Sequence, residues 1–263
     1  MILRGDIYEM NYCQEFSIDD IKLQPEWLWQ ESLLAADTPF STYFKCDHHY
    51  LISGSPERFI KKTGNKLLSQ PIKGTIARGV SSEEDEKNRA FLQANLKEQN
   101  ENVMIVDLLR NDLAKSCADH SVSVPQLCAL ESFSNVHHLV STVRGELAPD
   151  KTPLDALRVA FPGGSITGAP KIRAMQLIAA TEDRRRGPSY GSIGFIGFDG
   201  RMDTNIIIRT AIVKGDNIRF HAGGGIVADS QPQAEYDETL NKARGLMAAL
   251  GVTMVVADKN EVA

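Results

Sequence analysis

The strand-like segments of this chain are grouped together between helical segments and do not alternate with them one by one. The later strand-like runs lie at 191–198, 204–213 and 218–222, separated by the turn dipeptides Asp199-Gly200 and Gly215-Asp216. One helix is predicted to begin before this group, at Pro170, and another after it, from about Gln233 to Leu250. Strands gathered between helices favour an α+β fold over a regular βαβ repeat.

The first half of the chain shows the same grouping. Strands are predicted at 7–16, 41–53 and 57–68, and the last two segments are interpreted as a strand pair. Ser82 begins a charged helix, whose acidic first turn suits the positive end of the helix dipole. The helical pattern resumes from Glu98 to Lys115, with six apolar residues expected to be largely buried: Val103, Met104, Val106, Leu108, Leu109 and Leu113.

Composition excludes several classes of function. The chain has 263 residues, with 29 Lys and Arg against 34 Asp and Glu, a formal net charge of −5 and no basic block. We therefore expect no nucleic-acid partner. No apolar run approaches the roughly 18 residues needed to span a bilayer, so no membrane partner is expected either. The four cysteines have no C-x-x-C spacing, and the N-terminus lacks a secretion signal, which predicts reduced thiols in a cytoplasmic protein.

Three charged residues of the last predicted helix share one face. Glu235, Glu238 and Lys242 are spaced at i, i+3 and i+7, so the two carboxylates can converge beside the lysine. Such a face can bind a hard cation through oxygen ligands, but it can equally be a solvated face with a Glu→Lys pair. The segment 221–229 before it contains three consecutive glycines, which let backbone N–H groups approach a ligand closely.

A second glycine-rich segment runs from Phe161 to Lys171. It leads into a predicted helix with Pro170 at the first helical position, where free N–H groups favour an anion. The segment lacks the ending of a nucleotide P-loop, so we interpret it as an anion cradle without a nucleotide. The alternative is that its glycines only make a tight turn.

Lys73 lies in the segment 70–75, at the end of a predicted strand. Partial desolvation there would lower the pKa of its amine and make a nucleophile or base available, although most lysines in such positions are merely exposed.

Glu101 is either a solvated cap or a third carboxylate for the cation. Asp107 and Arg110, at i and i+3, are expected to form a structural pair.

Two further clusters are interpreted without a catalytic role. The adjacent histidines His137 and His138 have no metal-ligand spacing, so hydrogen-bonded structural histidines are the default expectation. The basic run 184–186 is flanked by Glu182 and Asp183 and is predicted to lie on the surface.

Taken together, five segments resemble the chorismate-utilising enzymes, in the order in which that family has them. These segments are 71–75 (PIKGT), 101–112 (ENVMIVDLLRND), 136–141 (VHHLVS), 161–175 (FPGGSITGAPKIRAM) and 222–230 (AGGGIVADS). The resemblance covers nearly the whole chain. It implies an α+β fold of two stacked, mostly antiparallel sheets with helices packed outside.

The resemblance also implies roles for residues at matching positions. Glu101 and Glu238, with Glu235 close by, would hold Mg²⁺, which would neutralise the ring carboxylate of chorismate. Of the two histidines, His138 matches the family residue near the ring. The residues implied to contact the substrate are Thr75, His138, Ser165, Tyr190, Arg209, Gly223, Gly225 and Lys242.

Lys73 separates the branches of the family. At this position of the motif, anthranilate synthases carry alanine, whereas aminodeoxychorismate synthases typically carry lysine. The resemblance therefore implies formation of 4-amino-4-deoxychorismate, a precursor of p-aminobenzoate and folate. Lys73 would be the nucleophile, and Glu57 would protonate the leaving hydroxyl group. Ammonia would come from a glutamine amidotransferase partner.

Two departures from the family pattern affect these expectations. The match begins at Gly5–Tyr8, so we expect a single catalytic domain over residues 1–263 without the upstream subdomain of longer relatives. Glu9 stands where many relatives have glutamine, on the side of the pocket expected to receive ammonia. Anthranilate synthase activity and a non-catalytic chorismate-binding role remain the alternatives.

Overall fold

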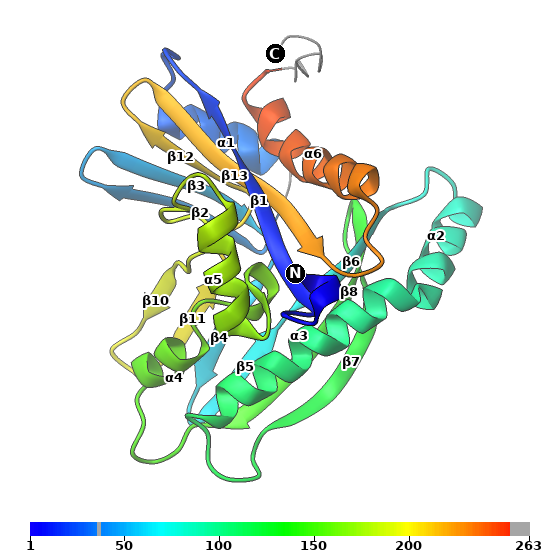
Figure 1. The fold of residues 1–263 in the computed structure, drawn as a ribbon. Helices are drawn as coiled ribbons and strands as arrows, with labels where there is room; N and C mark the ends of the chain where they lie inside the picture. Colours follow the sequence, from blue (N-terminus) through cyan, green and yellow to red (C-terminus); the bar gives the residue numbers. More distant parts are fainter. Residues whose placement is uncertain (36–37, 253–263) are drawn as a thin grey trace. The chain divides into compact units, whose positions relative to one another are not determined.

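The computed structural model describes residues 1–35 and 38–252, and it confirms an α+β fold with two antiparallel sheets (Figure 1). The helices are α1 (Pro25–Ala35), α2 (Ser82–Ala94), α3 (Leu96–Ala114), α4 (Pro153–Ala160), α5 (Lys171–Thr181) and α6 (Pro232–Ala249), with short 3-10 helices at Ile2–Arg4 and Gly164–Ile166. None of the helices in the described ranges has the length and apolar character needed to cross a membrane.

The strands fall into two sheets. They are β1 (Glu9–Ile18), β2 (Phe40–Cys46), β3 (His49–Ser55), β4 (Arg58–Thr63), β5 (Lys66–Gln70), β6 (Ile72–Ala77), β7 (Ser123–Ser132), β8 (Val136–Glu146), β9 (Gly168–Ala169), β10 (Gly194–Ile196), β11 (Met202–Asn205), β12 (Thr210–Lys214) and β13 (Asn217–Ile226). One sheet has the order β2-β3-β12-β13-β1-β9. The other has the order β10-β11-β4-β5-β8-β6, with β7 also paired to β8.

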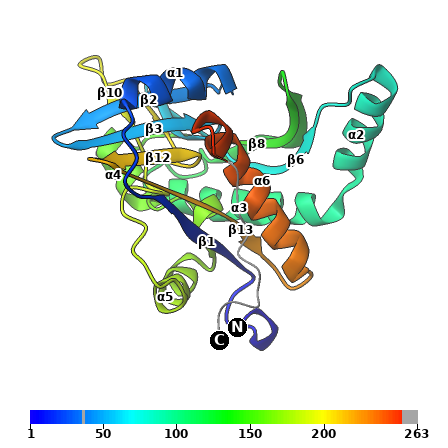
Figure 2. The ribbon, with the colours of Figure 1, turned by 90° about the horizontal axis from the view of Figure 1, so that it is seen from above.

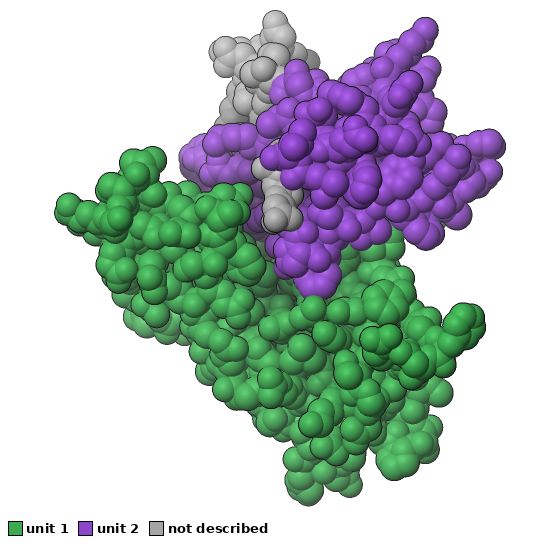
Figure 3. All heavy atoms as spheres, turned by 180° about the vertical axis from the view of Figure 1, so that it is seen from behind, with its two compact units in different colours: residues 1–12, 57–207, 225–230 green, residues 13–56, 208–224, 231–263 purple. Residues whose placement is uncertain are grey.

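The chain forms two compact units (Figure 3). Unit 1 contains residues 1–12, 57–207 and 225–230, and unit 2 contains residues 13–56, 208–224 and those from 231 onward. The strands β1 and β13 each begin in one unit and end in the other, so the backbone of both strands is continuous through the two units.

Unit 1 contains the whole seven-stranded sheet. The long helix α3 packs against β6, β7 and β8 (Figure 1), and Figure 2 shows it beside β6 and β8. The buried amide of Asn102 fixes this contact, because its Nδ2 donates to the carbonyl oxygen of Leu139 at 3.1 Å and its Oδ1 accepts a hydrogen bond from Ser141 Oγ. Polar groups buried in this way stabilise the fold only when both partners are satisfied. They hold α3 at one register along β8.

Unit 2 has its own hydrophobic core. Helix α1 packs against β3 and α6, and the rings of Phe16 and Phe220 stack with centroids 5.0 Å apart and planes 7° apart. The fully or almost fully buried side chains of this core include Leu28, Ile52, Val213, Ile218, Phe220 and Ala243.

The predicted strand boundaries need correction in three places. Segment 41–53 contains β2 and β3, segment 57–68 contains β4 and β5, and segment 204–213 contains β11 and β12. Each of the first two segments is therefore a hairpin and not a single member of a strand pair. The turn between β2 and β3 was missed because Asp47 adopts the left-handed conformation (φ 53°) without a glycine or proline to mark it.

The helix predictions are closer to the structure. Ser81 caps α2 by accepting a hydrogen bond from the Glu84 N–H, and α6 begins and ends within a residue of the prediction. Pro170 caps α5 and is not its first helical residue. The burial expected along α3 is wrong for Val103, which is 44% exposed, since that residue lies on the outer side of the helix. Helices α1 and α4 were not predicted.

Candidate active site

A buried lysine and two glutamates lie together in unit 1. Lys73, the second residue of β6, donates a hydrogen bond from Nζ to Glu9 Oε1 at 2.5 Å, and the same Nζ lies 3.5 Å from Glu101 Oε2 on α3. The Lys73 side chain is 11% exposed and that of Glu9 is fully buried. The sequence predicted Lys73 and Glu101 as site residues, but Glu9 was not recognised as the partner of Lys73.

The expectation that Lys73 has a lowered pKa is wrong. Burial does disfavour its ammonium form, but the carboxylates of Glu9, Glu101 and Glu57 outweigh burial and raise the pKa of Lys73. Burial also acts on Glu101, where it raises the pKa of the carboxyl to about 7 although Lys73 opposes the shift. Lys73 is therefore held as an ammonium ion among carboxylates in this structure.

Gly225, near the end of β13, lies against the same pair. A Cβ atom at this position would be 2.2 Å from Glu9 Oε1 and 2.8 Å from Lys73 Nζ, which is far inside van der Waals contact. The glycine run was predicted to allow close approach of the backbone to a ligand. At Gly225 the structure shows that the absent side chain leaves room for Glu9 and Lys73.

Glu57 and Ser165 form a second buried contact in unit 1. Ser165 Oγ donates to Glu57 Oε1 at 2.7 Å, and the backbone carbonyl of Ser165 accepts a 3.3 Å hydrogen bond from Asn11 Nδ2. Both predicted residues are thus brought together from the start of β4 and from the glycine-rich loop. Asn11 was missed, although it lies two residues after Glu9 in β1 and so points to the same face of the strand.

The glycines of this loop have packing roles. A Cβ atom at Gly163 or Gly164 would lie 2.7 Å from Ile206 or Leu108, and one at Gly168 would lie 2.1 Å from the backbone oxygen of Glu9. Gly168 also has a positive φ of 131°. These contacts account for the glycines as a tight, closely packed turn, and the anion cradle stays a prediction.

Thr75 and His138 are neighbours on β6 and β8. They are directly opposite in the strand register, and Thr75 Oγ1 lies 2.8 Å from His138 Nδ1. His137 points elsewhere, because its ring nitrogens contact Ser132 Oγ at 2.8 Å and Asp85 Oδ1 at 3.0 Å. The two histidines therefore have separate environments.

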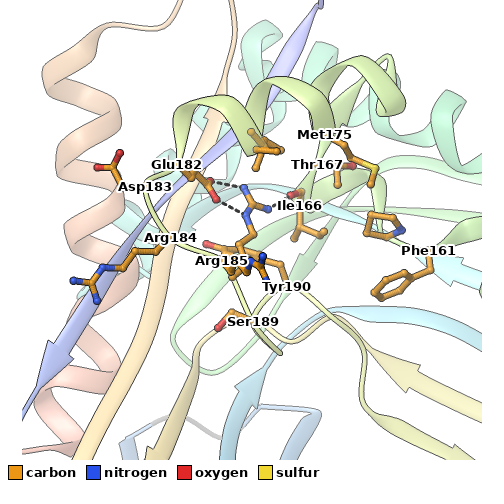
Figure 4. A pocket seen from close by; sticks show the side chains of 14 residues that line it. Phe161, Ile166, Thr167, Met175, Glu182, Asp183, Arg184, Arg185, Ser189 and Tyr190 are labelled. Carbon is orange, nitrogen blue, oxygen red and sulfur yellow. Dashed lines mark hydrogen bonds and ion pairs between the residues drawn. The ribbon is translucent and has the colours of Figure 1, made fainter.

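Tyr190 is buried and has a left-handed backbone conformation (φ 63°), which is uncommon for a residue with a bulky side chain. Its N–H donates to the Ile207 carbonyl at 2.7 Å. Tyr190 lines a cavity of about 550 Å³ in unit 1 (Figure 4). The cavity is lined by Phe161, Pro162, Ile166, Thr167, Met175, Ile178, Ala179, Glu182, Asp183, Arg184, Arg185, Arg186, Ser189 and Tyr190. Lys73 and Glu57 are not part of its lining.

The expectation that the basic run 184–186 lies wholly on the surface is wrong. Arg184 and Arg185 are exposed, but the Arg186 side chain is only 14% exposed. Arg186 forms a bidentate ion pair with Glu182 at 2.6 and 2.8 Å. A charged residue buried to this extent requires partners, and the sequence run by itself does not show which of its three members has them.

Unit 2 gathers the predicted charged face of α6. Lys242 Nζ lies 2.5 Å from Glu238 Oε1 and donates to the Gly223 carbonyl at 3.0 Å. A Cβ atom at Gly224 would lie 3.5 Å from Glu235 Oε2 and 3.6 Å from Glu238 Oε1, so both carboxylates border the glycine run. The i,i+4 pair of Glu238 and Lys242, predicted as the simpler alternative, is therefore also formed.

Arg209 lies in the same unit. It has a positive φ of 49°, and its carbonyl accepts a hydrogen bond from the Gly54 N–H.

The predicted metal ligands are divided between the units. Glu101 belongs to unit 1, whereas Glu235 and Glu238 belong to unit 2. Within the described part of either unit, no three His, Cys, Asp or Glu side chains are grouped closely enough to hold a metal ion. All three predicted ligands are carboxylates, two of them buried, and such oxygen donors are what Mg²⁺ prefers. The three-carboxylate site stays a prediction.

Comparisons with known proteins agree with the motifs. The family model described as chorismate binding enzyme matches residues 1–248. The chain is 44% identical over 247 residues to aminodeoxychorismate synthase component 1 of Escherichia coli (strain K12), covering 94% of this chain and 54% of that protein. It is 42% identical over 253 residues to the probable anthranilate synthase component 1 of Schizosaccharomyces pombe, covering 96% of this chain and 52% of that protein.

A solved structure shows the same fold. Anthranilate synthase component I from Streptococcus pneumoniae TIGR4 matches with a TM-score of 0.84 and 35% sequence identity, covering 93% of this chain and 54% of that one. The chain spans about half the length of the curated relatives that it matches. Since the family model matches almost the whole chain, and relatives are identical at more than four residues in ten, the chain belongs to the family of chorismate binding enzymes.

Proposed function

We propose that this chain has aminodeoxychorismate synthase component 1 activity, converting chorismate and ammonia to 4-amino-4-deoxychorismate. The observation that carries the proposal is Lys73, buried beside Glu9 and Glu101 at the position where aminodeoxychorismate synthases typically carry lysine and anthranilate synthases carry alanine. Relatives named aminodeoxychorismate synthase component 1 are 43% to 44% identical to the chain, and one named aminodeoxychorismate synthase, chloroplastic, is 49% identical, which supports the same assignment.

The proposed mechanism divides the substitution at carbon 4 into two steps. In the first, the amine of Lys73 attacks ring carbon 2, and the hydroxyl group on carbon 4 leaves as water after protonation by Glu57. In the second, ammonia attacks carbon 4 and displaces the lysine. Because an ammonium ion has no lone pair, Lys73 must first lose a proton, and Glu9 Oε1 already accepts a hydrogen bond from its nitrogen.

The remaining predicted residues are proposed to bind the substrate. Tyr190 and Arg209 would bind the enolpyruvyl carboxylate, the latter through its planar guanidinium group. The Thr75–His138 pair would lie beside the ring. The other proposed carboxylate contacts are Ser165, the backbone of Gly223 and Gly225, and Lys242.

Mg²⁺ is the proposed cofactor, held by Glu101 and Glu238 with Glu235 close by. When bound, it would neutralise the ring carboxylate of chorismate. Carboxylate oxygens suit this hard cation, and all three proposed ligands carry them, with Glu101 and Glu235 buried.

The proposed source of ammonia is a glutamine amidotransferase subunit. The relatives' designation as component 1 supports a second component. No disulfide bond joins the cysteines Cys13, Cys46, Cys117 and Cys128, all within the described residues, which suits the reducing cytoplasm where we propose that the protein works.

A product assay tests the proposal. The purified chain is incubated with chorismate, Mg²⁺ and excess ammonium at mildly alkaline pH, and the products are separated by chromatography. We expect 4-amino-4-deoxychorismate. Anthranilate together with pyruvate would instead support anthranilate synthase activity, which the similarity to anthranilate synthases makes the second candidate. Absence of both products would overturn the proposal.

A further inference from the structure

Arg186 connects four separate segments of unit 1. Its Nη1 donates to the Ile166 carbonyl at 2.7 Å, and its Nη2 donates to the Asn11 carbonyl at 2.7 Å. Nε and Nη2 also donate to the two carboxylate oxygens of Glu182, which caps the end of α5. The guanidinium carbon lies 4.6 Å from the centre of the Tyr190 ring.

These contacts reach groups to which the proposed function assigns substrate binding, or their immediate neighbours. Ile166 directly follows Ser165, whose hydroxyl group contacts Glu57, and the amide of Asn11 contacts the Ser165 carbonyl. Tyr190 has a positive φ, and a residue in that conformation remains there only when its surroundings hold it. The Arg186 guanidinium packs on its ring, so one side chain contacts the Ser165 loop, β1 and Tyr190 together.

The chemistry of the contact requires arginine. Four hydrogen bonds leave the guanidinium group in fixed, coplanar directions, and its flat face packs on an aromatic ring. A lysine ammonium carries the same charge but has three donors on one atom and no planar face. Neutralisation by Glu182 makes the burial of Arg186 tolerable, and both residues line the cavity described above.

We propose that Arg186 is a positioning residue for substrate binding, which acts through Tyr190 and Ser165 and not by touching the substrate. The inference rests on the proposed function, because it takes Tyr190 and Ser165 as groups that bind chorismate. It assigns a role to one member of the basic run 184–186, and the adjacent exposed arginines provide a control within the same run.

The first experiment needs no substrate. Hydrogen–deuterium exchange of the free chain is compared by mass spectrometry for wild type, Arg186→Lys and Arg185→Lys. In Arg186→Lys we expect faster exchange of the amides in residues 162–167 and 187–190. The second range includes the Tyr190 N–H, which donates a hydrogen bond to the Ile207 carbonyl in the structure. Arg185→Lys should match wild type because Arg185 is exposed. Unchanged exchange in folded Arg186→Lys would overturn the inference whether or not the chain binds chorismate.

The second experiment measures the dissociation constant of chorismate in the presence of Mg²⁺. We expect Arg186→Lys to weaken binding by tenfold or more. In a Tyr190→Phe, Ser165→Ala background the same substitution should have a much smaller effect, because the groups through which it acts are already absent. An equal effect in both backgrounds would indicate general destabilisation and overturn the inference. Wild-type protein that fails to bind chorismate would contradict the proposed function, while the exchange result would still decide the role of Arg186.

Discussion

At the scale of single residues, the charge state of Lys73 is set by its neighbours. One lysine shares a buried volume with Glu9, Glu101 and, at longer range, Glu57. Attraction to these carboxylates favours the ammonium form more than burial disfavours it. Without substrate, Lys73 is therefore an ammonium ion beside these glutamates. It must lose a proton before its nitrogen can act as a nucleophile.

Replacement of Lys73 tests its role as nucleophile. Lys73→Ala should reduce turnover by about a hundredfold or more, the scale seen when a group that acts directly in a reaction is removed. Chorismate binding should persist, since other residues are proposed to bind its carboxylates. Steady-state kinetics and a binding titration measure the two effects, with Lys66→Ala, an exposed lysine on β5, as the control. Unchanged turnover in Lys73→Ala would exclude the nucleophile role.

Gly225 gives a second prediction at this scale. Gly225→Ala places a methyl group 2.2 Å from Glu9 Oε1 and 2.8 Å from Lys73 Nζ, so the ends of these two side chains must shift. We expect turnover to fall at least about tenfold, equivalent to about 1.4 kcal/mol in activation free energy. Gly245→Ala on α6 is the matched control, because no atom lies within 4 Å of its added Cβ. Equal kinetics of the two variants would contradict the close packing at Gly225.

At the scale of elements, α2 is fastened to unit 1 at its first turn. Asp85 accepts two hydrogen bonds from the Arg78 guanidinium at 2.7 and 2.9 Å, one from the Gly79 N–H at 2.9 Å, and contacts buried His137. The hydrogen bonds from Arg78, followed by those from Gly79 and His137, hold the pKa of the Asp85 carboxyl far below its ordinary value. This network links the start of α2 to β6 and β8.

The depressed pKa of Asp85 predicts a pH-dependent contribution to stability. A carboxyl whose pKa is lower in the folded state stabilises that state above its unfolded pKa, about 3.9, and progressively less as pH falls below that value. Asp85→Asn should therefore unfold at lower urea concentration than wild type at pH 7, and the difference should narrow below about pH 4. Asp107→Asn, in the exposed pair with Arg110, serves as control. A constant difference from pH 7 to pH 3 would contradict this account.

At the scale of the whole molecule, two cores share two strands. Unit 2 has its own buried cluster around Phe220, while β1 and β13 pass without interruption from one unit to the other. Unfolding of one unit would therefore disorder part of a strand that also belongs to the other unit. We expect the chain to unfold in one cooperative transition.

Phe220→Ala tests this expectation. Removing a fully buried ring that stacks on Phe16 should lower the free energy of unfolding by about 3–5 kcal/mol. Calorimetry and denaturant titration followed by two probes should still show a single transition. Phe198→Ala, which alters an exposed ring, should change stability little. Two separate transitions in the Phe220→Ala protein would show that the units unfold independently.

The α+β class, the helices α2, α3 and α6, and the motifs that place the chain among the chorismate binding enzymes could all be predicted from residues near one another along the chain. These features depend on local chemistry: the cap at Ser81, the periodicity of charged and apolar residues, and glycines that backbone packing requires. The Glu238–Lys242 pair was predictable for the same reason, because four residues on a helix bring side chains to one face.

Which charged side chains form pairs could be seen only in the folded chain. Glu9 and Lys73 are 64 residues apart, and their ion pair reverses the pKa shift expected for a lysine that is merely desolvated. Arg186 belongs to a run that looks solvated, yet its partners Asn11 and Ile166 come from distant segments. Burial and long-range electrostatics depend on elements that pack together in space, and no local pattern of residues encodes these distances.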